Sequence, residues 1–365
     1  MWTENAKIER LDTSGRRIIV ISDIHANLQY FTALLKKIEL TPDDVLVLCG
    51  DFLEKGERSL DTLRYIMQLS KDYDVHPLCG NCDGWQDSVD GVFPTKSLRS
   101  YLLSRKCGLI WDMLTDCGVC PDEETDIPAL LPMLAERYSE EFAFLRALPH
   151  VIETPHCIFV HGGIRPDVPI GEQMAGDCMK FDDFMSQGYS FDKWVIVGHW
   201  PVMLYLKDRV CANPIIDRTH RIISIDGGCV LKDDGQLNAL IIPHEGSEDF
   251  HWQSWDRFPT AKVRTGQSES RRSYYIRWGD NRVQVLHRGD EFSHCRHVRT
   301  GYEMDILTKY LYGDGELVEC NDCTDYEPEL KPGDTVSIVE KTSRGYFVKH
   351  NGTSGWYHGE IYDEL

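Results

Sequence analysis

Short apolar runs recur along the first two thirds of the chain, and polar side chains follow directly after most of them. Runs at residues 17–21 and 44–49 are rich in valine, isoleucine and leucine, and a shorter run follows at 75–79. Each is too short for a helix, and this composition favours buried strands. The chain is therefore predicted to begin with three strands that each end in polar residues.

Helical periodicity separates these runs. Residues 27–38 place apolar side chains on one face of a helix, with Asn27 at its N-cap position. Residues 60–69 repeat the pattern. The alternation of strands and helices predicts an α/β fold.

A long helical stretch interrupts this alternation. Between about residues 94 and 150, leucines recur at helical spacing in two segments that the acidic residues 122–126 separate. We interpret this stretch as a helical insertion. The strand pattern then resumes at residues 157–160, 194–197, 221–225 and 237–242.

The pattern changes again near Phe258, where short alternating strands begin. Residues 273–278 and 282–286 flank the turn sequence Gly-Asp-Asn, which predicts a β-hairpin. We therefore divide the chain into a first domain at residues 1–255 and a β-rich C-terminal region at residues 256–365.

Part of the C-terminal region, at about residues 300–365, resembles a bacterial SH3-like barrel. Barrels of this kind bind peptides through exposed aromatic side chains. Tyr346, Trp356 and Tyr357 are the candidates for such a peptide-binding platform. They fit equally well as core and edge residues of the barrel.

The charge of the chain limits its partners. With 39 basic and 59 acidic residues, the net charge of −20 argues against nucleic acid or an anionic membrane as the main partner. No run reaches the roughly 20 apolar residues of a membrane-spanning helix, and the N-terminus lacks the layout of a signal peptide. We therefore expect a cytoplasmic protein.

The cysteine pattern agrees with a reducing environment. The chain has 13 cysteines, an odd number, and Cys49, Cys79 and Cys157 lie inside apolar runs, which favours reduced, buried thiols. Two C-x-x-C pairs occur, at residues 117–120 and 320–323. Because they lie far apart in sequence, we favour ordinary thiols over a shared structural zinc site.

Residue types that bind metals collect at the ends of the predicted strands. In chain order these are Asp23, His25, Asp51, Asn81, His161 and His199. In layered α/β proteins such strand ends meet at one edge, so residues far apart in sequence converge there. A mixture of carboxylates and imidazoles suits Mn, Fe or Zn better than Ca.

These residues lie in five blocks, which read SDIH, GDFLEKG, GNCD, HGG and GHW. Their order resembles that of the calcineurin-like metallophosphoesterases over roughly residues 16–245. The resemblance implies a layered α/β fold, with a central β-sandwich flanked by helices. It also implies that residues 1–255 form a catalytic domain carrying the helical insertion at about 94–150.

The resemblance further implies a dinuclear metal centre. Its ligands would be Asp23, His25 and Asp51 for the first metal and Asp51, Asn81, His161 and His199 for the second. A pair of cations screens the charge of a phosphate ester and makes hydroxide available at neutral pH to attack phosphorus. We expect two divalent ions, most simply Mn, with Fe, Zn or Ni as alternatives.

The GHW block indicates a branch of this superfamily. It lacks the second histidine found in many phosphodiesterases, and in this it resembles the phosphoprotein phosphatases and the bacterial diadenosine tetraphosphatases. The phosphate-gripping arginine of that group corresponds to Lys55, a point charge instead of a bidentate fork. Arg58 and Arg165 are the nearest guanidinium candidates for phosphate binding, and both also fit as solvated surface residues.

Cys82 is the main departure from the protein phosphatases. They place a histidine there to protonate the leaving oxygen, and Asp83 would orient that imidazole. A thiol with an ordinary pKa of about 8.5 is a poor general acid near neutrality. We name Asp51, Asn81, Cys82 and Asp83 as candidate catalytic residues and expect aryl or tyrosyl phosphates to react better than serine phosphate.

These observations predict a metal-dependent phosphatase that hydrolyses phosphate monoesters, of the bacterial protein serine/threonine or tyrosine phosphatase type. Its partners would be a phosphorylated protein or a small phosphoester, together with a peptide ligand of the SH3-like region. The main alternative is a phosphodiesterase or a dinucleoside polyphosphate hydrolase. A non-catalytic binding protein is a third hypothesis, but an unused site has no physical need for six correctly ordered ligands.

Overall fold

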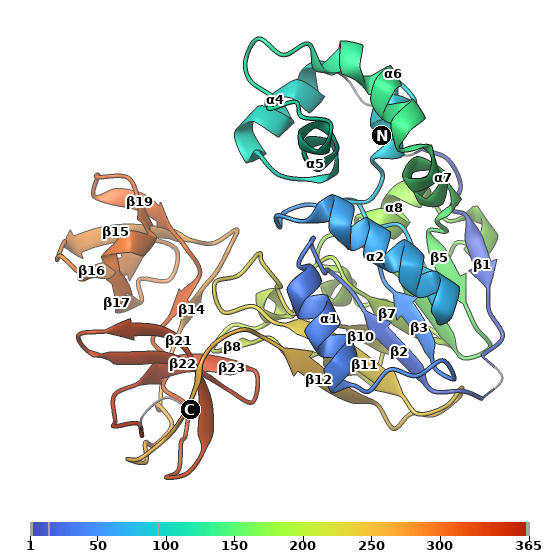
Figure 1. The fold of residues 1–365 in the computed structure, drawn as a ribbon. Coiled ribbons are helices and arrows are strands. Elements are labelled where there is room, and N and C mark those ends of the chain that lie inside the picture. The colour runs from blue at the N-terminus through green and yellow to red at the C-terminus, as the bar shows by residue number, and fades with distance from the viewer. Residues whose placement is uncertain (1–2, 14, 93–94, 363–365) are drawn as a thin grey trace. The chain divides into compact units, whose positions relative to one another are not determined.

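The computed structural model describes residues 3–13, 15–92 and 95–362. The chain forms two compact units (Figure 1). The first comprises Met1–Pro201, Pro214–Leu231 and Gly235–Asp256, and the second comprises Val202–Asn213, Lys232–Asp234 and Arg257–Leu365. The second unit thus takes two short segments from the region that the sequence assigned to residues 1–255.

Two sheets form the centre of the first unit. In the five-stranded sheet, β2, β3 and β4 are parallel neighbours, and β11 pairs antiparallel with β2. Its order is β12 (His251–Trp255), β11 (Leu237–Ile242), β2 (Ile18–Ile21), β3 (Val45–Leu48) and β4 (Asp74–Pro77). The six-stranded sheet has the order β1 (Ile8–Arg10), β5 (Val151–Glu153), β6 (Cys157–Val160), β7 (Trp194–Val197), β10 (Ile222–Ser224) and β9 (Ile215–Asp217).

The two sheets pack face to face. Alternate side chains of β2 and β3, such as Val20 and Val47, share a buried cluster with Phe159 and Ile196 of the other sheet. Because β2, β3, β6 and β7 are buried on both faces, they read as continuous apolar runs. The predicted β-sandwich is confirmed.

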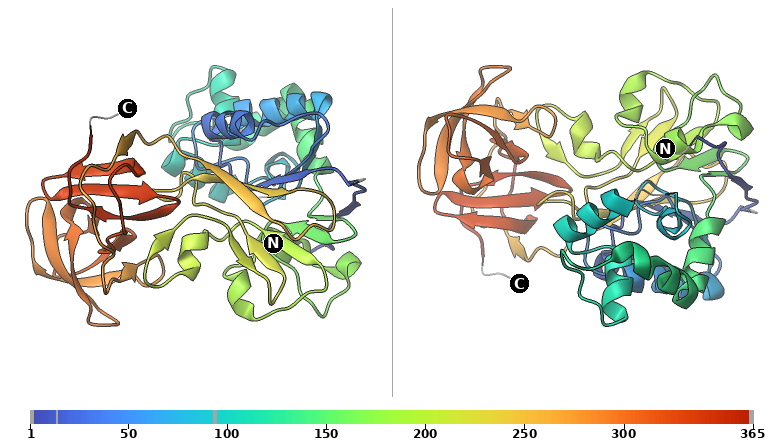
Figure 2. Two further views of the ribbon diagram at one scale, coloured as in Figure 1. Left: turned by 90° about the horizontal axis from the view of Figure 1, so that it is seen from below. Right: turned by 90° about the horizontal axis from the view of Figure 1, so that it is seen from above.

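Helices cover both outer faces of the sandwich. The opposite side chains of β2 and β3 pack with α1 (Leu28–Lys37) and α2 (Ser59–Asp72), and those of β6 and β7 pack near α8 (Ala175–Met179). Figure 2 shows these layers from two further directions. The Asn27 side chain accepts a hydrogen bond from the Tyr30 N–H at 3.3 Å, which confirms the predicted N-cap of α1.

The stretch between β4 and β5 is helical, as its leucine spacing predicted. It packs against α2 within the same apolar cluster. Its helices are α3 (Gln86–Val89), α4 (Thr95–Arg105), α5 (Leu109–Asp116), α6 (Ile127–Arg137) and α7 (Ser139–Ala147). The described helices include none that is long and apolar enough to cross a membrane. The cytoplasmic location stays a prediction.

His76 joins the edges of the two sheets. Its Nδ1 lies 2.6 Å from Glu9 in β1, and its Nε2 lies 2.8 Å from Asp74 in β4, which Arg16 also contacts. Burial disfavours a charged imidazole here, but the two carboxylates outweigh it and raise the pKa of His76 above its ordinary value. His76 is therefore protonated more readily in the folded state than in the unfolded state.

We expect this clamp, formed by His76 with Glu9 and Asp74, to make the free energy of unfolding depend on pH. Because the folded pKa of His76 exceeds the unfolded value, its contribution is complete below about pH 6.5 and is lost as the pH rises through the folded pKa. Urea unfolding of His76→Gln should therefore show a deficit of about 1 kcal/mol at pH 5.5 that shrinks at pH 8.5. A deficit that grows with pH would contradict the clamp, and Glu9→Gln together with Asp74→Asn should remove the pH dependence.

The second unit consists of β-strands. One five-stranded sheet has the order β17 (Glu303–Leu307), β16 (Phe292–His297), β15 (Arg282–His287), β19 (Leu317–Cys320) and β18 (Leu311–Tyr312). Another has the order β13 (Thr260–Lys262), β21 (Thr335–Thr342), β22 (Gly345–His350), β23 (Thr353–Tyr357) and β8 (Val210–Cys211). A third, two-stranded sheet pairs β14 (Tyr275–Ile276) with β20 (Cys323–Thr324). The β-rich C-terminal region is confirmed.

The hairpin predicted around residues 279–281 is wrong. The chain does turn there, because the Asp280 N–H donates to the Arg277 carbonyl at 3.0 Å. The flanking strands then separate, since β14 pairs with β20 whereas β15 pairs with β16 and β19. Buried Tyr275, which packs with Met203 and Val210, draws β14 away from β15.

The SH3-like barrel at about residues 300–365 stays a prediction. Strands β17 to β19 pair with β15 and β16, and the sheet of β21 to β23 also draws on β13 and β8. Tyr357 is fully buried, with its hydroxyl 2.7 Å from the Thr265 carbonyl oxygen, so it is a core residue and not part of an exposed platform. The peptide ligand likewise stays a prediction.

All 13 cysteines are free, which agrees with the predicted reduced thiols. In the pair at residues 320–323 the two sulfur atoms lie 4.0 Å apart. Among the described residues, neither C-x-x-C pair belongs to a group of side chains close enough together to hold a metal ion. The preference for ordinary thiols over zinc stays a prediction.

Candidate metal centre

The strand ends of both sheets supply the predicted ligands. Asp23 and His25 follow β2, Asp51 follows β3 and Asn81 follows β4, at the shared carboxyl ends of three parallel neighbours. His161 follows β6 and His199 follows β7, which are parallel neighbours in the other sheet. The structure therefore brings the carboxyl ends of two parallel strand sets together.

The ligand loops have an unusual backbone. Asp23, His25, Asp51 and His199 all have positive φ angles, between 48° and 65°. L-residues rarely adopt this region, and such strain collects at functional sites. Gly80 makes close packing of the loops possible, because a Cβ there would lie 2.3 Å from Asp51 Oδ1.

Three side chains converge at the first predicted metal position. His25 Nε2 lies 3.7 Å from Asp23 Oδ1 and 4.0 Å from Asp51 Oδ2. His25 Nδ1 lies 3.4 Å from the Leu53 carbonyl oxygen, to which it donates. The lone pair on Nε2 therefore faces the two carboxylates, as a metal ligand requires.

The second predicted position shares Asp51 with the first. His161 Nε2 lies 3.3 Å from Asp51 Oδ1, and the rings of His161 and His199 are 5.2 Å apart. His161 Nδ1 donates to the Cys49 carbonyl at 2.9 Å, and His199 Nε2 donates to Asp182 at 2.8 Å. Asp51, His161 and His199 offer ligand atoms within 4.8 Å of one another.

Four of the six predicted ligands carry a buried polar atom that has no hydrogen-bond partner in the part of the chain that the structure describes. These atoms are Asp23 Oδ1, His25 Nε2, Asn81 Oδ1 and His161 Nε2. Leaving a buried polar atom unpaired costs about 1–3 kcal/mol. Oxygen and imidazole lone pairs that point at the same place would find a partner in a divalent cation, which removes this cost. The residues therefore fit a metal centre.

The field at this centre favours positive charge. Burial opposes a charged imidazole at His161, but Asp51 and Asp23 outweigh it and raise the pKa of His161 to about 10. Burial, followed by the charge of Asp226, raises the pKa of Asp23 well above its ordinary value. Burial would also raise the pKa of Asp51, but His161 and His25 hold it well below its usual range. A cation would relieve the repulsion between these carboxylates.

Residues 16–226 match the family model of the calcineurin-like phosphoesterases. The chain belongs to this family. Membership of this family supports the prediction of a metal-dependent phosphoric ester hydrolase over that of a non-catalytic binding protein.

The curated relatives match this phosphoesterase over a short stretch. The symmetrical bis(5'-nucleosyl)-tetraphosphatase of Salmonella typhimurium is 42% identical over 65 residues, which are 18% of this chain and 22% of that protein. The proteins of the same description from Salmonella typhi and Salmonella newport match equally. The chain thus spans about a fifth of the length of the relatives it matches.

Solved structures resemble the phosphoesterase over a longer stretch. A cold-active protein-tyrosine phosphatase of a psychrophile Shewanella covers 68% of this chain and 82% of its own, with 14% identity and a TM-score of 0.44. A metallophosphoesterase from Sphaerobacter thermophilus covers 66% of this chain and 89% of its own, with 18% identity and a TM-score of 0.38.

In this phosphoesterase, Asp83 lies behind the ligand loops. It is fully buried and accepts hydrogen bonds from the backbone N–H groups of Asp51 at 2.7 Å, Gly80 at 2.9 Å and Leu53 at 3.1 Å. Burial, followed by the charge of Asp51, raises the pKa of Asp83 to about 7. These contacts support a positioning role for Asp83, and its predicted catalytic role stays a prediction.

Cys82 lies beside Asp51. Its backbone N–H donates to Asp51 Oδ1 at 2.7 Å, and its sulfur accepts from Asn81 Nδ2 at 3.2 Å. Burial, followed by the charge of Asp51, raises the pKa of the Cys82 thiol well above its ordinary value. The thiol is therefore an even poorer acid than the sequence indicated. His76 is no substitute, because carboxylates engage both of its ring nitrogens.

The three candidates for phosphate binding differ in their surroundings. Lys55 is half-buried on the loop that follows Asp51. Burial, and to a smaller extent the charge of Lys55, lower the pKa of His25 to about 4, which indicates that Lys55 acts on the centre. Arg58 instead pairs with Asp61 at 2.7 Å, and Arg165 pairs with Asp177 at 2.6 Å, both at the surface. Their roles stay predictions.

Sequence reasoning missed two carboxylates that support the centre. Asp182 holds His199 through Nε2, but it comes from a loop without any recognisable motif. Glu54 is buried and accepts from the Tyr101 hydroxyl at 2.8 Å and the Leu109 N–H at 2.7 Å, so it ties the Asp51 loop to the helical insertion. The sequence signal for Glu54 was its position inside the GDFLEKG block.

Proposed function

We propose that this protein is a dinuclear metal-dependent phosphatase for monoesters with good leaving groups, such as aryl and tyrosyl phosphates. The observation that carries the proposal is the set of four unpaired, buried ligand atoms around Asp51. Asp23, His25 and Asp51 would hold one divalent cation, and Asp51, Asn81, His161 and His199 would hold the other. Manganese is the first candidate, with iron, zinc or nickel as alternatives.

Each part of the centre has a role in this proposal. When bound, a pair of cations screens the phosphoryl oxygens and makes hydroxide available near neutral pH. Lys55 adds positive charge on the adjoining loop, where a phosphate group would lie. Asp83 holds the backbone of Asp51 and Gly80, and Asp182 holds the ring of His199. These contacts keep the ligands in place between catalytic cycles.

The surroundings of Cys82 favour good leaving groups. An alkoxide that leaves from a serine phosphate requires a proton, whereas a phenolate needs one much less. Neither the Cys82 thiol, with its raised pKa, nor His76 is suited to supply that proton. The proposal therefore places tyrosyl and aryl phosphates before seryl and threonyl phosphates among substrates.

A dinucleoside polyphosphate is the second candidate substrate. Cleavage of a phosphoanhydride expels a nucleotide whose terminal phosphate is stable as an anion, so it also proceeds without a strong general acid. The similarity to the symmetrical bis(5'-nucleosyl)-tetraphosphatases supports this candidate. Hydrolysis of a phosphodiester with a good leaving group is compatible with the same chemistry.

Chelation and a substrate panel test the proposal. We expect EDTA to abolish hydrolysis of p-nitrophenyl phosphate and Mn to restore it. In this proposal the cations held by the six ligands are what would supply hydroxide and screen the phosphate. Steady-state rates on phosphotyrosine and phosphoserine peptides, bis-p-nitrophenyl phosphate and diadenosine tetraphosphate then rank the candidate substrates. Activity that survives complete chelation would refute the metal assignment, and a preference for phosphoserine would refute the leaving-group argument.

A further inference from the structure

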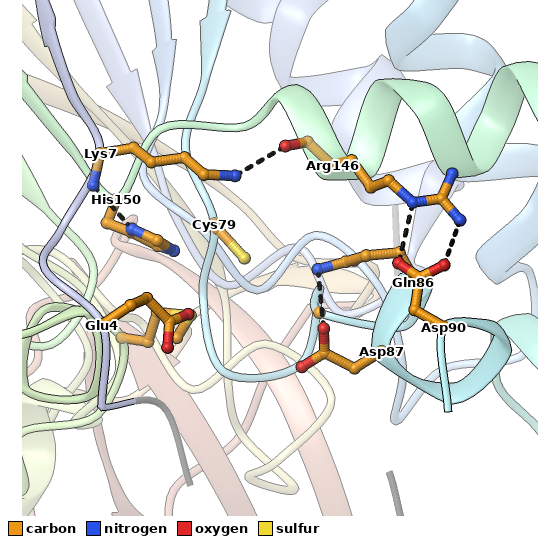
Figure 3. A pocket seen from close by; sticks show the side chains of 10 residues that line it. Glu4, Lys7, Cys79, Gln86, Asp87, Asp90, Arg146 and His150 are labelled. Atoms are coloured by element: carbon orange, nitrogen blue, oxygen red, sulfur yellow. Dashed lines mark hydrogen bonds and ion pairs between the residues drawn. The ribbon is translucent and has the colours of Figure 1, made fainter. Parts of the chain in front are cut away.

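The loop that carries Asn81 holds two cysteines, and their thiols have different surroundings. Cys79 lies two residues after β4 and lines a polar cavity of about 260 Å³. Figure 3 shows its side chain among the polar residues around this cavity. None of the six proposed metal ligands is among the described residues that line it. Cys82, on the other side of Asn81, instead lies beside Asp51.

Cys82 belongs to a group of three side chains that could hold a metal ion. Among the described residues, two such groups have ligand atoms that all lie within 4.8 Å of one another. One consists of His25, Asp51 and Cys82, and the other of Asp51, His161 and His199. Asp51 belongs to both groups, as a residue that bridges two metals would. Cys82 is therefore grouped with the ligands of the first metal position.

Hydrogen bonds of the loop hold the Cys82 sulfur in this place. The Cys82 backbone N–H donates to Asp51 Oδ1 at 2.7 Å, which fixes the residue against the shared carboxylate. The sulfur accepts a hydrogen bond from Asn81 Nδ2 at 3.2 Å. This contact uses the nitrogen of the Asn81 amide and leaves Oδ1, which has no partner in the described part of the chain, for the second metal position. Two neighbouring residues can thus serve the two positions.

A cation at the first position would change the state of this thiol. Burial, followed by the charge of Asp51, raises the pKa of the Cys82 thiol. A divalent ion beside the sulfur counteracts both effects, because a thiol that coordinates a metal ion is deprotonated. A coordinated thiolate has no proton to give to a leaving group. This role therefore agrees with the preference for aryl and tyrosyl phosphates in the proposed function.

A sulfur ligand also narrows the choice of metal. Thiolates favour zinc and iron, whereas manganese is bound mainly by carboxylate, carbonyl and water oxygens. With Cys82 included, the first position offers a sulfur donor together with the imidazole of His25 and the carboxylates of Asp23 and Asp51. The ligands proposed for the second position offer only nitrogen and oxygen. The two positions therefore differ in the metals they would prefer.

We propose that Cys82 is a thiolate ligand of the first metal position and that this position takes a thiophilic divalent ion, zinc or iron. The proposal rests on the dinuclear centre of the proposed function, to which it adds a ligand. When the sulfur binds the metal ion, the thiol proton passes to solvent.

Cobalt(II) spectroscopy of the full-length protein tests this ligand directly. Cobalt(II) substitutes for zinc, and a thiolate bound to it gives a sulfur-to-cobalt charge-transfer band in the near ultraviolet. Oxygen and imidazole ligands give no such band. The protein is exchanged into cobalt(II) by dialysis, and bound cobalt is counted by elemental analysis. We expect two cobalt ions per chain together with the charge-transfer band.

Variants of the two loop cysteines locate the band. Cys82→Ser should lose it and bind zinc at the first position at least about tenfold more weakly, since even outer-shell substitutions typically cost about 10–100-fold in metal affinity. Cys82→Asp, which replaces the thiolate by a carboxylate ligand, should keep two cobalt ions without the band. Cys79→Ser is the matched control, because Cys79 lies on the same loop and its thiol donates to the Gly80 carbonyl at 3.4 Å, a contact that a hydroxyl can keep. The control should retain both the band and the zinc affinity.

The possible failures of this proposal and of the metal centre are distinguishable. Two bound cobalt ions without a charge-transfer band in the wild type would overturn the thiolate ligand and leave the dinuclear centre intact. A band that persists in folded Cys82→Ser or Cys82→Asp would also overturn it, because the sulfur would then come from another cysteine. Failure of the wild type to bind cobalt would reject the metal centre together with this ligand. Circular dichroism checks the folding of each variant, and the wild-type band decides the proposal even if neither Cys82 variant folds.

Discussion

Asp51→Asn should abolish hydrolysis of aryl phosphates and reduce metal content at both positions. Asp51 Oδ2 faces His25 Nε2 and its Oδ1 faces His161 Nε2, so a single side chain serves both predicted metals. An amide lacks the negative charge and the second acceptor oxygen that a bridge requires. We expect a loss larger than the roughly 10–100-fold typical of outer-shell substitutions, measured as kcat/KM together with metal analysis of the purified protein.

Two further variants, Asp61→Asn and Lys55→Met, serve as comparisons for Asp51→Asn. Asp61→Asn changes an exposed carboxylate that pairs with Arg58, and it should leave both activity and metal content intact. Lys55→Met should lower activity less than Asp51→Asn does, because it removes a nearby charge and no ligand. If Asp51→Asn retains two metals per chain, Asp51 does not bridge them and the dinuclear assignment fails.

Cys82→His should make the enzyme less dependent on the leaving group. The wild-type thiol, with its raised pKa, gives little acid catalysis, so rates should fall steeply as the leaving-group pKa rises. An imidazole at this position, next to Asp83, would supply a proton, and general-acid catalysis contributes about 10²–10⁴-fold. The measurement is kcat/KM for a graded series of aryl and alkyl phosphates, and the gain should be largest for alkyl phosphates.

Cys82→Ser distinguishes this explanation from a second one. The Cys82 sulfur lies within 4.8 Å of ligand atoms of His25 and Asp51, so it also qualifies as a metal ligand. If the thiol is only a missing acid, Cys82→Ser should keep its metals and its steep dependence on the leaving group. Loss of metal in Cys82→Ser would assign the thiol to the centre instead. Equal dependence in wild type and Cys82→His would reject the missing-acid hypothesis.

Much of the first unit could be predicted from local pattern. Strands β2, β3, β6 and β7 are covered on both faces. Each of them is therefore an unbroken run of apolar residues in the sequence. Asn27 could be identified as a helix cap because capping involves neighbours only three residues away. The six ligand candidates could be found because each lies within four residues of the end of a strand.

Other elements had no local signal. Strands β1 and β5 are three residues long and exist through pairing with distant segments: Ile8 of β1 faces Val151 of β5, and β5 also pairs with β6. The turn at residues 279–281 has a strong hairpin sequence, yet its flanking strands join different sheets. In both cases the deciding contacts come from segments far away in sequence, which a periodicity window does not contain.

The sequence by itself determined the apolar strands, the helical insertion and the identity and order of the candidate ligands, because these depend on residue type and local spacing. Only the tertiary structure decided that Asp51 faces both His25 and His161, that Gly80 gives Asp51 room and that Asp182 orients His199. It also placed Arg58 and Arg165 in surface ion pairs and Lys55 on the half-buried loop. In the contacts of Asp51 with the two histidines and Gly80, and of His199 with Asp182, the partners lie 17 to 110 positions apart in the sequence. Their distances are set when strands and loops pack together in the fold, so local composition carries no trace of them.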